Sequence, residues 1–180
     1  RHINIASNAA LETTGTLFLD PSFNTGPYTT LVSGDGTLRL KMTASTAATP
    51  DIFYDSTGGD GSGWGVAITT PVDMGSTHRY VAGLINRNDF EDYQGDLRFD
   101  GVISGTGGVT FVGGPNNSGH RLSLVISQPN TFTGGVTLSD NVFAILVDPN
   151  AFNGDNNAVD ISPSAGQTAG IYLYGHDATI

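Results

Sequence analysis

The sequence predicts an all-β protein folded as a parallel β-helix, in which each turn of chain stacks on the turn before it. Short apolar/polar alternations recur along the chain, each bounded by Gly, Asn, Pro or Ser, and no segment of ten or more residues shows the 3.6-residue period of a helix. The phrase GGVT also occurs at 107–110 and again at 134–137, an offset of 134 − 107 = 27 residues. An offset of this size is typical of solenoid coils.

The expected strands are short and are separated by turns of variable length. They cover residues 2–5, 16–19, 28–33, 37–42, 51–54, 66–69, 79–85, 96–103, 108–112, 121–126, 135–138, 141–147, 159–162, 170–174 and 177–180. Asp100-Gly101 is expected to lie inside one continuous strand over 96–103, and residues 71–77 are expected to form a loop.

Loop lengths favour a solenoid over a sandwich. A sandwich of hairpins would show two-residue Asn-Gly or Asp-Gly turns between alternating runs, and these are scarce here. Stacked coils tolerate loops of any length at their corners. One alternative stays open, because residues 1–95 could form a sandwich or jelly roll of their own. We therefore distinguish a β-rich segment 1–95, expected to be continuous with the solenoid, from coils over 96–180.

The composition excludes several classes of function. Lys and Arg total 7 against 17 Asp and Glu, so the formal net charge is −10 and no cationic cluster suits nucleic acid. The chain has no Cys, and no run of about 18 apolar residues that would form a membrane-spanning helix. An acidic surface poor in Lys suits an extracellular protein.

A family resemblance rests on three segments of the C-terminal half. ISGTGGVT at 103–110, LSL at 122–124 and PNTFTGGVTL at 129–138 resemble the autotransporter-associated β-strand repeat, over about residues 96–180. The chain departs from that repeat at Phe111, where Lys is common, and at 119–121. The resemblance implies a right-handed parallel β-helix at the bacterial cell surface. It carries over no catalytic residue, because the repeat is a scaffold.

One dense carboxylate cluster is the candidate for catalysis. Its members are Asp89, Glu91, Asp92, Asp96 and Asp100. A polysaccharide-active β-helix enzyme would use such carboxylates together with a base, for which Arg87 or Arg98 is available. The same charges would also keep a loop solvated and a sheet edge soluble. The chain is therefore expected not to be an enzyme, with polysaccharide lysis or hydrolysis as the alternative.

Oxygen donors at short spacing raise the possibility of a Ca²⁺ site, and no other cofactor is indicated. The candidate ligands are Asp148, Asn150, Asn153 and Asp155, with Asn157 and Asp160 following. Gly58–Gly63 also resembles the Gly/Asp repeat of calcium β-rolls. Asn and Asp are equally favoured in turns without metal.

Two kinds of partner are expected. Trp64, Tyr54, Tyr80 and Tyr93 would form a sugar-stacking platform if they lie on the surface, although aromatic residues also pack on or cap a solenoid. The terminal coils of a solenoid expose unpaired strand edges and apolar core, which must be capped or paired. The sequence therefore predicts a non-enzymatic surface stalk, adhesin passenger or fibre subunit, with a carbohydrate-binding or calcium-stabilised β domain as a further alternative. Its partners would be further copies of the chain, or a glycan or cell surface.

Overall fold

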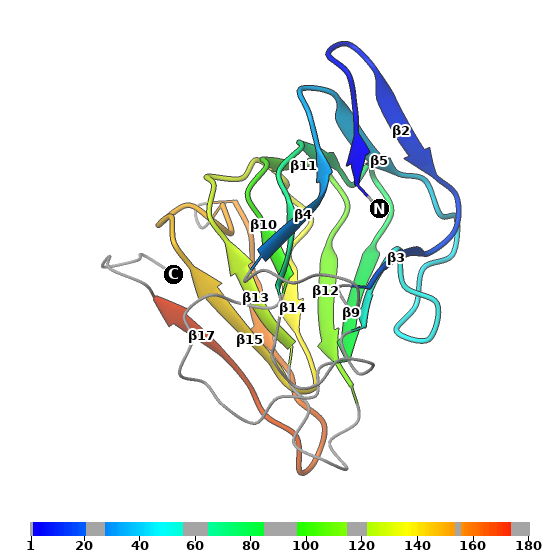
Figure 1. Ribbon diagram of the computed structural model, residues 1–180. Helices are drawn as coiled ribbons and strands as arrows, with labels where there is room; N and C mark the ends of the chain where they lie inside the picture. The colour runs from blue at the N-terminus through cyan, green and yellow to red at the C-terminus, as the bar shows by residue number, and fades with distance from the viewer. Residues whose placement is uncertain are drawn as a thin grey trace.

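The computed structural model describes residues 2–20, 28–55, 65–84, 97–114, 122–153 and 156–173. They form a parallel β-solenoid of about five turns. Figure 1 shows the blue first coil and the red β17 at opposite ends of the stack. The β-helix predicted from the repeat and the alternations is confirmed.

Three parallel sheets form the walls of the solenoid. Sheet A is ordered β1 (Ile3–Asn4), β4 (Tyr28–Ser33), β7 (Gly65–Ile68), β10 (Leu97–Phe99), β13 (Leu122–Ile126), β15 (Val142–Leu146) and β17 (Ala169–Leu173). Sheet B is ordered β2 (Ala10–Thr13), β5 (Thr37–Leu40), β8 (Val72–Asp73) and β11 (Ile103–Ser104). Sheet C is ordered β3 (Leu17–Leu19), β6 (Ile52–Asp55), β9 (Arg79–Leu84), β12 (Val109–Gly113), β14 (Val136–Leu138) and β16 (Val159–Ile161).

The N-terminal half belongs to the same solenoid. Its described strands pair in parallel, as in β1 with β4, β2 with β5 and β3 with β6. The alternative of a separate sandwich or jelly roll for residues 1–95 is wrong, because those folds are built from antiparallel pairs. Sheet A also runs through the boundary between the two segments, since β7 pairs with β10.

The repeated GGVT phrase marks two neighbouring coils. Val109 pairs with Val136 and Thr110 with Thr137, so the 27-residue offset of the sequence is the offset between β12 and β14. A Cβ on Gly134 would run into the backbone of Gly107 in the preceding coil, and a Cβ on Gly107 would run into the backbone of Thr77 one coil earlier. The repeat therefore conserves close backbone packing as well as strand register.

Coil length varies although the stacking does not. Along sheet A, Leu97 pairs with Leu124, an offset of 124 − 97 = 27 residues. Val32 pairs with Ile68, 68 − 32 = 36 residues on. Leu122 pairs with Val142, only 142 − 122 = 20 residues on. In the longest of these coils, residues 41–51 connect β5 to β6 at the corner between sheets B and C, as the variable loops predicted.

Three local predictions need correction. The expected continuous strand over 96–103 is two strands, β10 and β11, because the chain turns from sheet A to sheet B at Gly101, whose backbone lies against Thr70. The expected loop over 71–77 contains β8, and β2 adds a strand at Ala10–Thr13 that was not assigned. The strand expected at 177–180 lies outside the described residues.

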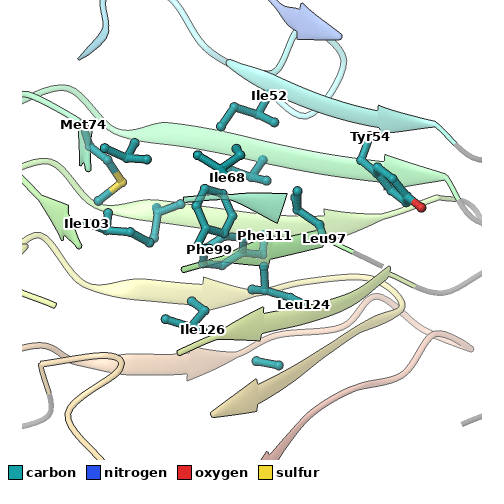
Figure 2. Close-up of a cluster of buried hydrophobic side chains, with 14 of the residues drawn as sticks. Ile52, Tyr54, Ile68, Met74, Leu97, Phe99, Ile103, Phe111, Leu124 and Ile126 are labelled. Carbon is teal, nitrogen blue, oxygen red and sulfur yellow. The ribbon is translucent and has the colours of Figure 1, made fainter. Parts of the chain in front are cut away.

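The core is a set of apolar ladders inside the coil. One ladder of sheet A joins Val32, Ile68, Phe99, Ile126 and Leu146 in register, and all five are buried. Figure 2 shows Phe99 close to Phe111 of sheet C. Their ring centroids lie 6.4 Å apart at 65°, an edge-to-face arrangement. The expected stack of Leu122, Leu124 and Val136 is buried too.

A buried ion pair lies at the corner between sheets B and C. Arg79 is 3 % exposed and Asp51 0 %, and Arg79 Nη1 donates to Asp51 Oδ1 at 3.0 Å. The guanidinium also donates to the carbonyl oxygens of Met74 at 2.7 Å, Met42 at 2.7 Å and Leu40 at 2.5 Å. One buried side chain therefore satisfies three carbonyls and a buried carboxylate.

Buried asparagines connect the later coils. Asn130 Oδ1 accepts the Ile103 N–H at 2.6 Å, and its Nδ2 donates to the Ala151 carbonyl at 2.5 Å, so this amide joins the coils on both sides of it. Asn141 has a positive φ of 54° and donates to the Gly114 carbonyl at 2.9 Å. At the corners between sheets, these side-chain amides hydrogen-bond to backbone N–H and C=O groups of neighbouring coils, which lie 21–27 residues away in the sequence.

Candidate functional site

Of the acidic cluster, the described residues contain Asp100. It lies just after β10, where both of its carboxylate oxygens accept hydrogen bonds from Arg98 at 2.9–3.2 Å. The Ser127 hydroxyl donates to Asp100 Oδ1 at 2.6 Å from the next coil. Asp89, Glu91, Asp92, Asp96 and the candidate base Arg87 lie outside the described residues. What the structure shows of the cluster is thus a hydrogen-bonded corner between two coils.

The pKa of Asp100 reflects this environment. Burial favours the neutral acid, but hydrogen bonds from Arg98 and Ser127 and the positive charge of Arg98 outweigh it. They hold the pKa of Asp100 below its usual value of 3.8. Because the folded pKa is depressed, the ionised group stabilises the fold above pH 3.8 and loses that contribution as pH falls through the folded pKa.

Replacing Asp100 with Asn should therefore lower stability in a pH-dependent way. At neutral pH, Asp100→Asn should unfold at lower denaturant concentration than the wild type, because Arg98 and Ser127 lose a charged acceptor. The gap should narrow as pH drops below 3.8. Urea unfolding curves across this range measure the gap, and a gap that stays constant from neutral to acid pH would contradict the prediction.

The proposed calcium ligands lie in a loop after β15, where they make turn hydrogen bonds. Asp148 Oδ1 accepts the Asn150 N–H at 2.7 Å, and Asn153, at a φ of 53°, donates to the Phe132 carbonyl at 2.9 Å. Asn157 donates to the same carbonyl at 2.8 Å. Asp155 and the Gly58–Gly63 segment lie outside the described residues. Asp148 therefore closes a turn within its own loop, while Asn153 and Asn157 satisfy the Phe132 carbonyl of the preceding coil.

The expected aromatic platform is not assembled as predicted. Tyr54 is completely buried and points into the core with Ile52, so it cannot contact a ligand on the surface. Tyr80 lies on the outer face of sheet C and is half-buried. Trp64 and Tyr93 lie outside the described residues.

A different aromatic residue dominates that outer face. Phe18 is 70 % exposed, and its ring meets the ring of Phe53 from the next coil at a centroid distance of 5.7 Å. Sequence reasoning missed Phe18 because it stands in an apolar run, Leu17-Phe18-Leu19, where alternation does not indicate a face. The signal lay in the pairing of β3 with β6, which sets Leu17 beside buried Ile52 and turns Phe18 outward.

The two ends of the solenoid form its most open apolar surfaces. Partly buried apolar side chains that pack against the core are Ile3, Leu11 and Leu17 in the first coil and Val159, Ala169, Ile171 and Leu173 in the last strands. Ile161 pairs in register with Leu138, yet Ile161 is 46 % exposed and Leu138 0 %. Leu138 is covered by the strand that follows it in sheet C, whereas Ile161 lies on the outermost described strand, so the side chain of Ile161 is left open.

Strand edges are open at the same two ends. Among the strands that the structure describes, the outermost are β1 and β17 in sheet A and β3 and β16 in sheet C, so each of the four has a described neighbouring strand on one side only. In sheet B the outermost strands are β2 and β11. We define the first-coil strands β1–β3 as the N-terminal end face, and β16 with β17 as the C-terminal end face. Each combines a strand edge that lacks a described neighbour with partly exposed core.

Two further findings concern metal binding and membrane spanning by the described residues. Nowhere in the described ranges do three or more His, Cys, Asp or Glu side chains gather closely enough to hold a metal ion. The same residues include no helix that is long and apolar enough to cross a membrane.

No protein-family model, curated protein or solved structure matches the chain.

Proposed function

We propose that this chain is a non-enzymatic structural module of an extracellular protein, a length of solenoid that extends by stacking coil on coil. The single observation that carries the proposal is the exposure of Ile161. Ile161 pairs in register with Leu138, but Leu138 is 0 % exposed whereas Ile161, on the last described strand of sheet C, is 46 % exposed. A surface of this kind is complementary to another coil of the same fold.

The chemistry of the two end faces supports head-to-tail contact. Both present apolar side chains flanked by strand edges that have no partner among the described strands, so a C-terminal end face placed against an N-terminal end face repeats the contact that exists between successive coils. Such a contact uses two different surfaces of the chain and does not close on itself, so it generates a filament. We infer a second copy of the chain as the partner of the isolated module.

The location rests on composition and on the family resemblance. An acidic, Cys-free chain with few Lys residues suits a solvated cell-surface protein. The segments 103–110 and 129–138, which resemble the autotransporter-associated repeat, form coils of the solenoid as such a repeat would. We extend the proposal to membership in that family of bacterial surface proteins and to its right-handed coil.

The alternative of a polysaccharide-active enzyme has less support in the described residues. Of its nominated groups, Arg98 and Asp100 pair with each other and with Ser127, at a corner where they join two coils. A catalytic carboxylate needs access to a substrate, and these contacts occupy both oxygens of Asp100.

The proposal is tested by the mass and shape of the purified chain. We expect rods in negative-stain micrographs, and a mass in analytical ultracentrifugation that rises with protein concentration and with salt. Salt should strengthen association because each copy carries a net charge of −10, and added ions screen the repulsion between copies. The double variant Ile161→Lys/Ile171→Lys places two charges on the C-terminal end face and should sediment as a monomer.

A variant on the side of the solenoid provides the control. Val102 is 36 % exposed and lies between β10 and β11, away from both end faces, so Val102→Lys should associate like the wild type. Equal masses for the wild type and the double variant at every concentration and salt level would refute stacking through the end faces.

A further inference from the structure

The outermost described strand of sheet C, β16, carries two apolar side chains that are left partly open. Val159 and Ile161 pair in register with Val136 and Leu138 of β14, both of which are buried. Val159 itself is only partly buried against the core, and Ile161 is exposed. The two side chains therefore belong to core rows of the solenoid but are not covered on the side that faces away from β14. We call that side of the strand the β16 edge.

The backbone groups of the same two residues point to the β16 edge. Alternate residues of a parallel strand direct their N–H and C=O groups to opposite sides of the strand. The Ser162 N–H donates to the Leu138 carbonyl at 2.9 Å, and the Ala158 carbonyl accepts an N–H of β14 at the same distance. Positions 158 and 162 thus face β14, so Val159 and Ile161 face the other way. A strand added there would meet hydrogen-bonding groups and apolar side chains together.

The earlier strands of sheet C show which side chains such a strand would supply. In β12 and β14, the first and third residues face the core and the residue between them points outward. The buried pairs are Val109 with Phe111 and Val136 with Leu138. The next strand of the series would therefore place two apolar side chains, separated by one residue, over Val159 and Ile161.

Asp160 selects the residue between those two apolar side chains. It is exposed on the outer face of β16, in register with Thr137, and its Oδ2 accepts a hydrogen bond from the Ser162 hydroxyl. The middle residue of an added strand would lie beside this carboxylate, at the strand spacing of about 4.8 Å. A Lys or Arg at that position is attracted to Asp160, whereas an Asp or Glu is repelled.

A second copy stacked on the C-terminal end face does not cover the β16 edge. Among the described strands, the first and the last, β1 and β17, both belong to sheet A, and the chain makes one strand of sheet C between each two successive strands of sheet A. If β1 of a second copy follows β17, its β3 lies two strand spacings beyond β16, roughly 10 Å away. One strand position in sheet C then stays empty, and it has the width of one extended segment.

We propose that the β16 edge binds an extended peptide segment of a partner protein, in which two apolar residues flank a basic one. The segment adds to sheet C as a parallel strand and hydrogen-bonds to the backbones of Val159 and Ile161. Its two apolar side chains cover the open core, and its basic residue faces Asp160. This interaction goes beyond the proposed stacking of copies, because it needs only one copy of the chain.

An NMR titration of the backbone amides with two peptides tests the proposal. Acetyl-Gly-Val-Lys-Leu-Ser-Gly-amide carries the proposed pattern, and acetyl-Gly-Val-Leu-Lys-Ser-Gly-amide has the same composition with its apolar residues adjacent. We expect the first peptide to bind with a Kd of about 1 mM and to shift the amide signals of Val159 and Ile161. The second should bind at least about tenfold more weakly. Glu in place of Lys in the first peptide should weaken binding several-fold.

Three variants assign the binding to the β16 edge. Ile161→Lys should weaken binding of the first peptide about tenfold or more, because it places a charge where an apolar contact is needed. Asp160→Asn should bind the Lys and Glu peptides about equally. Phe18→Ala is the matched control, because Phe18 is also exposed on an outermost described strand of sheet C but lies at the opposite end of the solenoid. It should bind like the wild type, and all three variants should keep the wild-type circular dichroism spectrum.

The proposal is overturned if the first peptide leaves the amide signals of Val159 and Ile161 unshifted at millimolar concentration, or if the two peptides of equal composition bind equally well. Binding by Ile161→Lys at wild-type strength would overturn it too. Ultracentrifugation separates this interaction from stacking. A chain that stays monomeric but binds the peptide refutes stacking alone, whereas a chain that associates without binding the peptide refutes the β16 proposal alone.

Discussion

Arg79→Met is expected to destabilise the protein by about 3–5 kcal/mol, the range seen when one partner of a buried ion pair is removed. The substitution keeps much of the aliphatic volume but leaves the carboxyl group of Asp51, which is 0 % exposed, without its ion-pair partner. It also removes the donors to the carbonyls of Leu40, Met42 and Met74. The hydrogen bonds to Leu40 and Met42 hold the start of the β5–β6 connection at the corner, and the bond to Met74 holds the end of β8, so local structure should loosen with the loss of stability.

Denaturant unfolding measures the effect, with Arg98→Met as its control. The Arg98 side chain is 27 % exposed and pairs with Asp100, so its loss should cost about 1 kcal/mol or less. The double variant Arg79→Met/Asp51→Leu separates two causes. If the unpaired Asp51 charge dominates, the double variant should recover most of the stability. If the three orphaned carbonyls dominate, it should not. A loss below 1 kcal/mol in Arg79→Met would contradict both.

Phe99→Ala is expected to cost about 3–5 kcal/mol, because it empties a site at the centre of the coil. Phe99 is 2 % exposed, stacks between Ile68 and Ile126, and meets Phe111 across the core. The parallel coils above and below are fixed by their own hydrogen bonds, so they have little freedom to collapse into the space.

The matched control is the same substitution at Phe18, which is 70 % exposed and should cost less than about 1 kcal/mol. Thermal or urea unfolding of both variants gives the comparison. A double-mutant cycle between Phe99 and Phe111 should show a coupling of about 0.5–1.5 kcal/mol from their edge-to-face contact. Similar losses at Phe18 and Phe99 would mean that the interior ladder is not what stabilises the fold.

The sequence contained enough to predict the architecture. Because parallel strands in a solenoid stack directly, a repeated phrase at 107–110 and 134–137 is also a statement of register, and Val109 does pair with Val136. Alternation likewise placed Leu122 and Leu124 on the buried face. These signals are local or nearly so, and they depend only on the two-residue period of a strand.

Corners were harder to predict, for a physical reason. Leu97, Phe99 and Ile103 all face the core and stand at alternate positions, with Gly101 between them, so the alternation continues through the turn from sheet A to sheet B. Nothing in the period reveals the bend. Strands as short as Val72–Asp73 contain no full alternation at all, which is why β8 was expected to be a loop.

Side-chain roles that depend on distant partners were missed as well. Arg79 faces the core because Asp51 and three carbonyls from other segments converge on it, and no local pattern around Arg79 reports them. Tyr54 is the opposite case, because its position two residues after Ile52 already indicated the buried face. The outward position of Phe18 needed the register of β3 with β6.

The unequal coils of this protein separate chain length from physical length. Hydrogen bonding between strands sets the rise at about 4.8 Å per coil, whether a coil takes the 20 residues between Leu122 and Val142 (142 − 122) or the 36 between Val32 and Ile68 (68 − 32). A gene can therefore gain or lose residues at a corner without changing the length of the rod or the alignment of its side-chain rows. Residue number is a poor ruler for such a molecule, and coil number is the better one.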